Sequence, residues 1–246
     1  MPQVSVRVVG APSAGGSLGS REGARGAVVA IPVRTRLVRS GDDIARIVAD
    51  AVAGIARPGD VIAVSETAVA IAQGRAIAAE RIRPSKLAYV LSRQASALAT
   101  VSQPESLQLV IDAAGAWKVL YASAMHVVGH AVGRRGAFYE ILGETIATID
   151  GYTGTMPPYE RAIVLGPEDP DGVAAAIAEA SGAHAVVVDV NDLNGAKTLG
   201  ASAGSNVGCV EHALRSNPHG NGDEQTPIVV LAWRGAGPSP LLEDAA

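Results

Sequence analysis

Residues 59–75 read GDVIAVSETAVAIAQGR, and this stretch indicates the fold class. The apolar run 61–65 follows a Gly-Asp turn and has the length of a short buried strand. Polar residues, among them Ser65 and Glu66, follow at its carboxyl end, and the next apolar segment completes a strand–loop–helix unit. Strand ends of this kind are where α/β proteins tend to bind ligands. From chemistry alone, an ordinary strand–loop–helix without a ligand is the favoured interpretation. Ser65 and Glu66 are the candidate site residues if this strand end binds a ligand.

The same alternation of strands and helices recurs along the chain. Apolar runs predict further strands at 27–33, 117–122, 161–166, 184–190 and 227–233. Apolar residues at helical spacing predict helices at 42–56, 104–114 and 169–182. Strands that alternate with helices indicate a mixed α/β or α+β architecture.

Composition and sequence patterns indicate how the chain is divided into domains and which classes of partner are excluded. Residues 1–26 are expected to form a flexible extension, 27–235 the folded domain and 236–246 a tail. A net charge of -4 argues against a nucleic-acid binder, since phosphate contacts need a surplus of basic residues. No apolar run has the length of a membrane span, and no signal-peptide pattern opens the chain. With a single cysteine, these features predict a cytoplasmic protein.

Residues 186–195, VVVDVNDLNG, carry the clearest group of possible metal ligands. Alternate residues of a strand point the same way, so Asp189 and Asn191 should share a face while Asp192 leaves it. Hard cations such as Mg²⁺ or Mn²⁺ take carboxylate and amide oxygens. An Asx-type turn explains the same residues equally well, and both interpretations stay open.

Two other segments could hold an anion. The loop 200–208, GASAGSNVG, precedes an expected helix, whose free amides could bind an anion with help from Ser202, Ser205 and Asn206. Arg135, beside another arginine, could clamp a phosphate or carboxylate. A tight turn with helix caps, and a solvated surface arginine, are the plain alternatives. His126 and His130 would share a face on a helix, but the neighbouring valines and glycines argue against a helix there.

The motifs together, in their order along the chain, resemble the coenzyme F420-0:L-glutamate ligase family. In that family a GD-strand segment ends in EGR, a PEDPD-type segment opens a helix, a strand ends in a Ser-Asp-Thr-aromatic-Gly run, and a PVVLIRG-type strand closes the domain. The corresponding segments here are Gln73–Arg75, Pro167–Asp171, Asn191–Gly195 and Pro227–Gly235, with Gly41–Asp43 before the first helix. Each motif is weak alone, and their order and spacing carry the resemblance.

The resemblance implies a fold, a chemistry and a set of site residues. Members have an F420 ligase-like fold of two lobes and form intertwined homodimers. They activate a carboxylate with GTP, with the help of two divalent cations, and an amino acid then attacks to form an amide. By position, Asp150 and Asp192 look like metal ligands, with Asp189 as a nearby alternative and Asn191 beside it. Apart from the resemblance, Glu66 and Arg135 are the candidate catalytic residues.

This sequence also departs from the family. The family's strand ends in Thr-Gln-Lys and a second lysine follows, whereas the matching positions here are Ser65, Glu66, Thr67 and Ile71. The expected function is therefore a divergent ligase, dependent on Mg²⁺ or Mn²⁺ and a nucleotide such as GTP, that acts on a small-molecule carboxylate. One alternative is a non-catalytic binding or regulatory homologue that kept the fold. Another is a metal-dependent hydrolase.

Overall fold

The computed structural model describes most of the chain as two compact units. The described residues are 7–9, 27–94, 100–131, 133, 136–143, 149, 151, 157–191, 195–220, 224–235 and 238–243. Unit 1 comprises Met1–Gly74 and Pro167–Ala246, and unit 2 comprises Arg75–Gly166. Each unit has helices, strands and an apolar core of its own.

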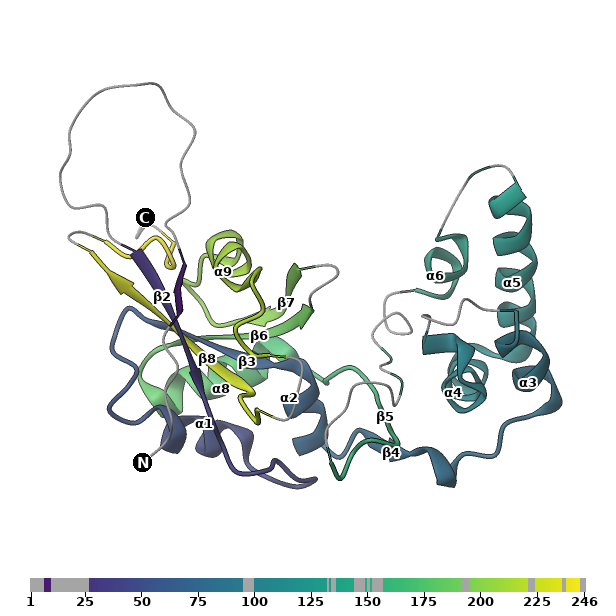
Figure 1. Cartoon of the computed structure of the whole chain (residues 1–246), viewed down its shortest axis with the longest axis horizontal. Coiled ribbons are helices and arrows are strands. Elements are labelled where there is room, and N and C mark those ends of the chain that lie inside the picture. Colours follow the sequence, from purple (N-terminus) through teal and green to yellow (C-terminus); the bar gives the residue numbers. More distant parts are fainter. Residues whose placement is uncertain are drawn as a thin grey trace. The chain divides into compact units, whose positions relative to one another are not determined.

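Unit 1 is built on a six-stranded mixed sheet with the order β1-β2-β8-β3-β6-β7 (Figure 1). Its strands are β1 (Arg7–Val9), β2 (Ala27–Val33), β3 (Val61–Ser65), β6 (His184–Asn191), β7 (Gly195–Ala201) and β8 (Ile228–Arg234). Only β3 and β6 pair in parallel, and the other neighbours are antiparallel. The β3–β6 pair therefore brings two carboxyl strand ends together.

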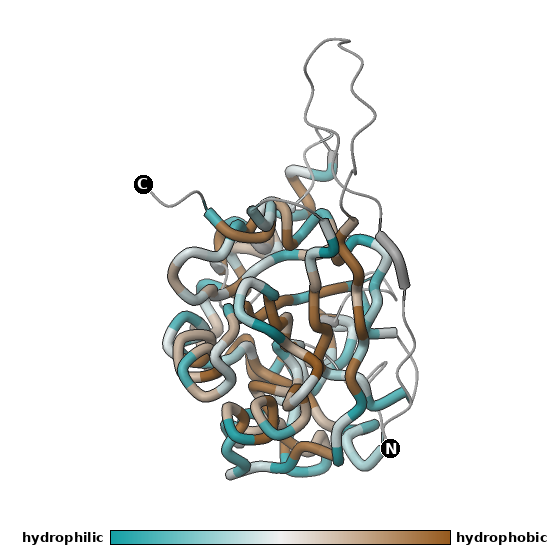
Figure 2. The backbone as a smooth tube through the Cα atoms, turned by 90° about the vertical axis from the view of Figure 1, so that its left-hand side faces the viewer, coloured by the Kyte–Doolittle hydropathy of each residue, from teal (hydrophilic) through white to brown (hydrophobic). Residues whose placement is uncertain are grey.

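Helices cover both faces of this sheet, and the central segments are mostly apolar (Figure 2). On one face lie α1 (Ile44–Val52), α2 (Glu66–Ala72) and α8 (Pro170–Ser181), which pack against Ile62, Val64 and Val187. On the other face lies α9 (Val207–Leu214), which packs against Ala63 and Val188. Unit 1 is thus a three-layer sandwich, and the alternation along β3 and β6 decides which face each side chain meets.

Local sequence signals explain where the helices of unit 1 begin and end. Asp43 caps α1 by accepting a hydrogen bond from the amide of Arg46, and Asp169 caps α8 by accepting one from Gly172. The helix α8 ends at Gly182, which takes the left-handed conformation with φ 73°. Asp169 is thus the N-cap of α8.

Unit 2 contains a small sheet and a group of helices. The sheet pairs β4 (Ala76–Ala78) with β5 (Ala162–Val164) in antiparallel fashion. The helices are α3 (Lys86–Ser92), α4 (Pro104–Ala114), α5 (Ala116–Ala131) and α6 (Ala137–Leu142), with short 3-10 turns at Ala79–Arg81 and Thr100–Ser102. Their core includes Leu107, Val119, Phe138 and Ile163. None of the described helices is long and apolar enough to cross a membrane.

Two predictions for unit 2 were wrong. Residues 117–122 form part of helix α5 rather than a strand, and His126 and His130 lie on that same helix, with ring centroids 6.4 Å apart. Tryptophan, valine and tyrosine favour strands, but here Val119 and Ala122 are the buried residues, and a spacing of three is helical. The helix spacing was hidden because α5 is apolar on its exposed side as well.

Most other predicted elements were confirmed, with shifted ends. The strands at 27–33, 61–65, 184–191 and 228–234 and the helices at 104–114 and 170–181 stand where their patterns put them. The first helix is shorter than predicted, and the strand within 161–166 belongs to the small sheet of unit 2. The strand β7 was missed, since its sequence GAKTLGA contains glycines and few β-formers.

Candidate functional site

The candidate site lies at the edge of the unit 1 sheet where β3 and β6 end. Ser65 pairs with Val188 across the parallel β3–β6 ladder, so the residues after both strands meet at this edge. The amide of Ser65 donates to the carbonyl of Pro227 at 2.8 Å, which places the start of β8 there too. Such an edge is where sheets of this type bind ligands.

Asp189 and Asn191 lie side by side on one face of β6, as their spacing predicted. Nδ2 of Asn191 donates a hydrogen bond to Oδ1 of Asp189 at 3.4 Å, and both residues are part-buried. Alternation along β6 puts them on the face of Ala185 and Val187, which α1, α2 and α8 cover. Two side-chain oxygens facing one way suit a hard cation.

Lys197 is a basic neighbour of this pair that the sequence motifs did not assign to the site. It lies directly opposite Asp189 in the antiparallel β6–β7 register and is exposed. Opposite residues of an antiparallel pair project on the same face of the sheet. The edge therefore offers a positive charge beside the two oxygen donors. Strand β7 had to be recognised before this pairing could be found.

Ser65 and Glu66 sit at the same edge, at the start of α2. Ser65 is the N-cap of α2 but makes no side-chain capping bond, and Glu66, in the first turn, is only 8% exposed. Alternation puts the Ser65 side chain on the α9 face with Ala63, so Ser65 shares the edge with Asp189 but not the face. Glu66 begins the helix whose Val69 packs on the same face of the sheet as Asp189 and Asn191.

Ser202, Ser205 and Asn206 lie at the opposite edge of the sheet, beside the start of β6. Ser202 Oγ accepts a hydrogen bond from the amide of Ala185 at 2.9 Å and lies 3.2 Å from Ser205 Oγ. Asn206 caps α9 by accepting from the amide of Cys209. Ala185 and Asp189 are four residues apart on β6, roughly 13 Å along the strand. The three predicted anion-binding residues therefore do not join the group around Asp189.

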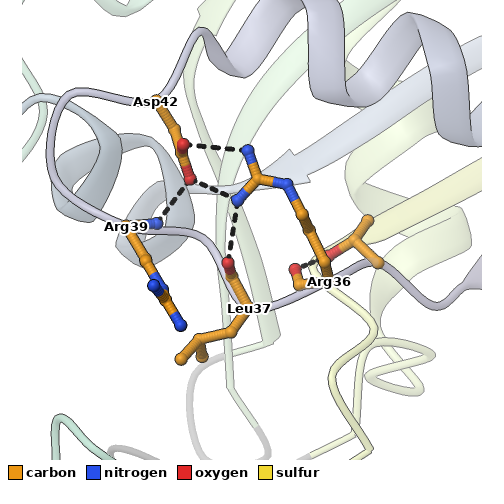
Figure 3. Close-up of polar contacts among 5 residues, drawn as sticks. Arg36, Leu37, Arg39 and Asp42 are labelled. Carbon is orange, nitrogen blue, oxygen red and sulfur yellow. Dashed lines mark hydrogen bonds and ion pairs between the residues drawn. The ribbon is translucent and has the colours of Figure 1, made fainter.

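The loop after β2 holds the Gly-Asp-Asp motif in a structural role (Figure 3). Arg36 binds both carboxylate oxygens of Asp42 at 2.7 and 2.8 Å, and the amide of Arg39 donates to the same carboxylate. The Arg36 guanidinium and the Arg39 amide lower the pKa of Asp42 to about 2. Asp42 thus braces the loop, while Asp43 caps α1.

His219 is a second residue near this edge that the sequence did not single out. Its Nδ1 donates to the carbonyl of Thr226 at 3.1 Å, one residue before the Pro227 that binds Ser65. Its Nε2 is buried and has no hydrogen-bond partner among the described residues. Burial lowers the pKa of His219 to about 4, so the ring is neutral at physiological pH. The sequence around His219, RSNPHGNGDEQTP at 215–227, is polar and without periodicity, so it gave no signal for a buried histidine.

Three predicted site residues lie outside the described part of the chain. They are Arg135, Asp150 and Asp192. Within the described ranges, no three His, Cys, Asp or Glu side chains form a group that could hold a metal ion. The described metal donors are therefore Asp189 and Asn191, which fit a hard cation in kind and would need further ligands from water, substrate or other residues.

Comparison with known protein families finds a match over most of the chain. A family model for F420-0:gamma-glutamyl ligase matches residues 32–214, about three quarters of the chain. The chain belongs to the F420-0:gamma-glutamyl ligase family. A search of curated proteins found no match.

The family match includes most of the candidate edge. It runs from the end of β2 to the end of α9 and so contains Ser65, Glu66, Asp189 and Lys197. It also contains all of unit 2. The strand β8 and His219 lie beyond the matched span, so the resemblance of Pro227–Gly235 to the family's closing strand rests on the sequence alone.

Proposed function

We propose that this F420-0:gamma-glutamyl ligase family member is a ligase that forms an amide bond between a small-molecule carboxylate and an amine, at the edge where β3 and β6 end. Family membership supports the ligase class. The observation that carries the site assignment is the hydrogen-bonded pair Asp189–Asn191 on one face of β6. We propose GTP as the nucleotide and a homodimer as the assembly, in line with the family resemblance.

The candidate residues have different proposed roles. Asp189 and Asn191 would hold Mg²⁺ or Mn²⁺. Asp150 and Asp192 stay candidate metal ligands by family resemblance alone, since both lie outside the described residues. When bound, the cation offsets negative charge on the phosphates during phosphoryl transfer. Lys197, opposite Asp189, would hold an anionic group of the nucleotide or the substrate. Glu66 and Arg135 are the proposed catalytic residues, and Ser65 lies at the same edge on the α9 face of the sheet.

Metal binding is the first test of this proposal. Calorimetric titration with Mn²⁺ should give a dissociation constant that rises at least about tenfold in Asp189→Asn, which keeps the shape and removes the charge. Glu179→Gln is the matched control, since Glu179 is an exposed acid on α8, and it should bind Mn²⁺ as wild type does. Equal affinity in wild type and Asp189→Asn would refute a metal site at this pair.

The reaction class needs a separate measurement. GTP with Mn²⁺ should raise the melting temperature of the wild type, by an amount set by ligand concentration and affinity. Phosphate release should then require both a carboxylate and an amine acceptor. Phosphate release without any amine would instead indicate the hydrolase. A protein that no nucleotide stabilises would be the non-catalytic homologue, and the family lysines missing at Thr67 and Ile71 favour this second candidate.

A further inference from the structure

His126 and His130 lie one turn apart on helix α5 of unit 2 (Figure 1). Both side chains are exposed, and their ring centroids are 6.4 Å apart, with the ring planes inclined at 51°. Residues four positions apart on a helix are surface neighbours, so the helical conformation of this segment is what brings the two imidazoles together. The structure therefore holds two nitrogen ligands side by side, on a helix that contributes no residue to the proposed ligase site.

We propose that His126 and His130 form a two-histidine chelate for a divalent transition metal, with Cu²⁺, Ni²⁺ and Zn²⁺ as the ions that it takes. Imidazole nitrogen suits these metals, whereas the hard cations Mg²⁺ and Ca²⁺ prefer oxygen ligands. The chelate thus differs in ligand type from the oxygen pair Asp189–Asn191 on β6. Water or groups of another molecule complete the coordination shell, as at metal sites that keep positions open.

The distance between the two rings suits one shared ion. A metal such as zinc lies about 2.0–2.1 Å from a histidine nitrogen, so two rings on one ion have centroids roughly 5 Å apart. The observed separation of 6.4 Å leaves an approach of about 1–2 Å for chelation. Rotation about χ2, which has a broad energy well in histidine, supplies this movement, because both side chains are exposed. The main chain of α5 therefore stays as it is when the ion binds.

The place of the pair near the end of α5 also favours a cation. His130 lies in the last turn of the helix, where carbonyl groups without helical partners give a partial negative charge. Lys118, the one lysine of α5, lies roughly 12 Å from His126 along the helix axis, so salt largely screens its repulsion of a bound ion. The helix end thus adds an electrostatic attraction to the two ligands.

The other histidines of the chain offer no such pair. The part of the chain that the structure describes includes all five histidines, and only His126 and His130 pair their rings. His184 and His219 lie on separate segments, and each has Nδ1 beside a main-chain carbonyl, at 3.0 and 3.1 Å. The pair on α5 is therefore where two imidazoles can reach one ion.

Calorimetric titration of untagged protein with Ni²⁺ tests the chelate in a Cys209→Ser background, which removes the single native thiol. His126→Asn and His130→Asn should each raise the dissociation constant by about tenfold or more, because the second imidazole of a chelate binds as an intramolecular ligand. His212→Asn, on α9, is the matched control and should bind Ni²⁺ as the background protein does. Equal affinity in the background protein and His126→Asn would overturn the proposal, as would an equal loss of affinity in His212→Asn.

A second comparison separates the spacing of the histidines from their number. The double variant His130→Asn/Val128→His keeps two histidines on α5, since Val128 is exposed, but residues at this spacing do not face each other. It should bind Ni²⁺ as weakly as His130→Asn, and affinity equal to that of the background protein would contradict the chelate.

The proposal can fail independently of the ligase proposal. Asp189→Asn, the variant that tests the Mn²⁺ site on β6, should keep the affinity of the background protein for Ni²⁺, because its change lies in unit 1. Loss of the tight Ni²⁺ site in Asp189→Asn would place that site on β6 and overturn the assignment to α5.

Discussion

Gln73 makes both of its side-chain hydrogen bonds with the main chain of Glu168. Nε2 donates to the carbonyl and Oε1 accepts from the amide, each at 2.8 Å. Gln73 directly follows α2, and Glu168 comes shortly before α8, so one amide side chain ties the two places where the chain leaves and re-enters unit 1. Here the family motif EGR has glutamine in place of glutamate, and only an amide can serve both main-chain groups.

Gln73→Ala should lower the free energy of unfolding of unit 1 by about 1–2 kcal/mol, because two hydrogen bonds are lost. Gln73→Glu keeps the acceptor and loses the donor, so its cost should be about half as large. Trp233 fluorescence during urea unfolding measures this in a Trp117→Phe background, where Trp233 is the only tryptophan. Glu179→Ala, an exposed truncation on α8, should change the midpoint little. Equal stability of Gln73→Ala and Glu179→Ala would show that the tie contributes nothing.

The loss of stability on substituting Asp169 should follow an unusual order, with glycine less harmful than alanine. It caps α8 and also holds a left-handed backbone with φ 43°. Asn keeps a capping oxygen and tolerates this backbone, Gly relieves the backbone but loses the cap, and Ala loses both advantages. The melting temperature should therefore fall least for Asn, more for Gly and most for Ala, with Asp169→Ala costing about 2 kcal/mol. Alanine more stable than glycine here would mean that the backbone conformation is unstrained.

Gly200→Ala should be strongly destabilising. A Cβ at Gly200 would lie 2.3 Å from the carbonyl carbon of Pro170, so β7 and the start of α8 would have to separate. We expect a cost of roughly 3 kcal/mol, measured by thermal unfolding. Gly208→Ala is the matched control, because the nearest atom to its Cβ is 3.8 Å away, and it should stabilise α9 by up to about 1 kcal/mol. Equal melting temperatures for the two variants would contradict the close approach.

Ser202→Ala should reduce stability and leave Mn²⁺ binding at the other edge unchanged. It removes the oxygen that pairs with the buried amide of Ala185, at a cost of about 1–3 kcal/mol. Ser205→Ala keeps that bond and should cost less. Chemical denaturation and Mn²⁺ calorimetry on both variants give the two readouts. A stable Ser202→Ala protein that no longer responds to nucleotide would favour the anion-binding role that the sequence predicted for this loop.

Unit 1 should lose stability in mild acid because of His219. Its folded pKa of about 4 lies below the unfolded value of about 6.5, so the unfolded chain binds a proton first as the pH falls. The unfolding free energy should therefore decrease between about pH 6.5 and pH 4, by up to about 1.4 kcal/mol per pH unit, and stay level above this window.

The His219→Asn variant isolates this effect, since its amide can still donate to Thr226. Urea unfolding at several pH values, followed by Trp233 in the Trp117→Phe background, should show a shallower pH slope for His219→Asn. The exposed His130→Asn, on α5, should keep the steep slope. The same slope in all three proteins would show that His219 is not the source.

The sequence predicted the elements of unit 1 better than those of unit 2, for a physical reason. Strands such as 61–65 and 184–190 are continuous apolar runs, and Asp169 and Gly182 mark the ends of α8 by local chemistry that needs no tertiary contact. In α5 the apolar residues lie on both sides of the helix, so the spacing of its buried positions could not be separated from that of its exposed ones. The strand-like reading of 117–122 followed from this ambiguity.

The candidate site also has one feature that the sequence predicted and others that it could not. The pleat of a strand is a local property, so the shared face of Asp189 and Asn191 could be predicted from their spacing and was confirmed by their hydrogen bond. The order of the strands and the pairing of β6 with β7 depend on side-chain packing between segments far apart in the chain. Only the tertiary structure therefore brought Lys197 beside Asp189, joined His219 to Thr226 just before β8, and set Ser202 at the opposite edge of the sheet.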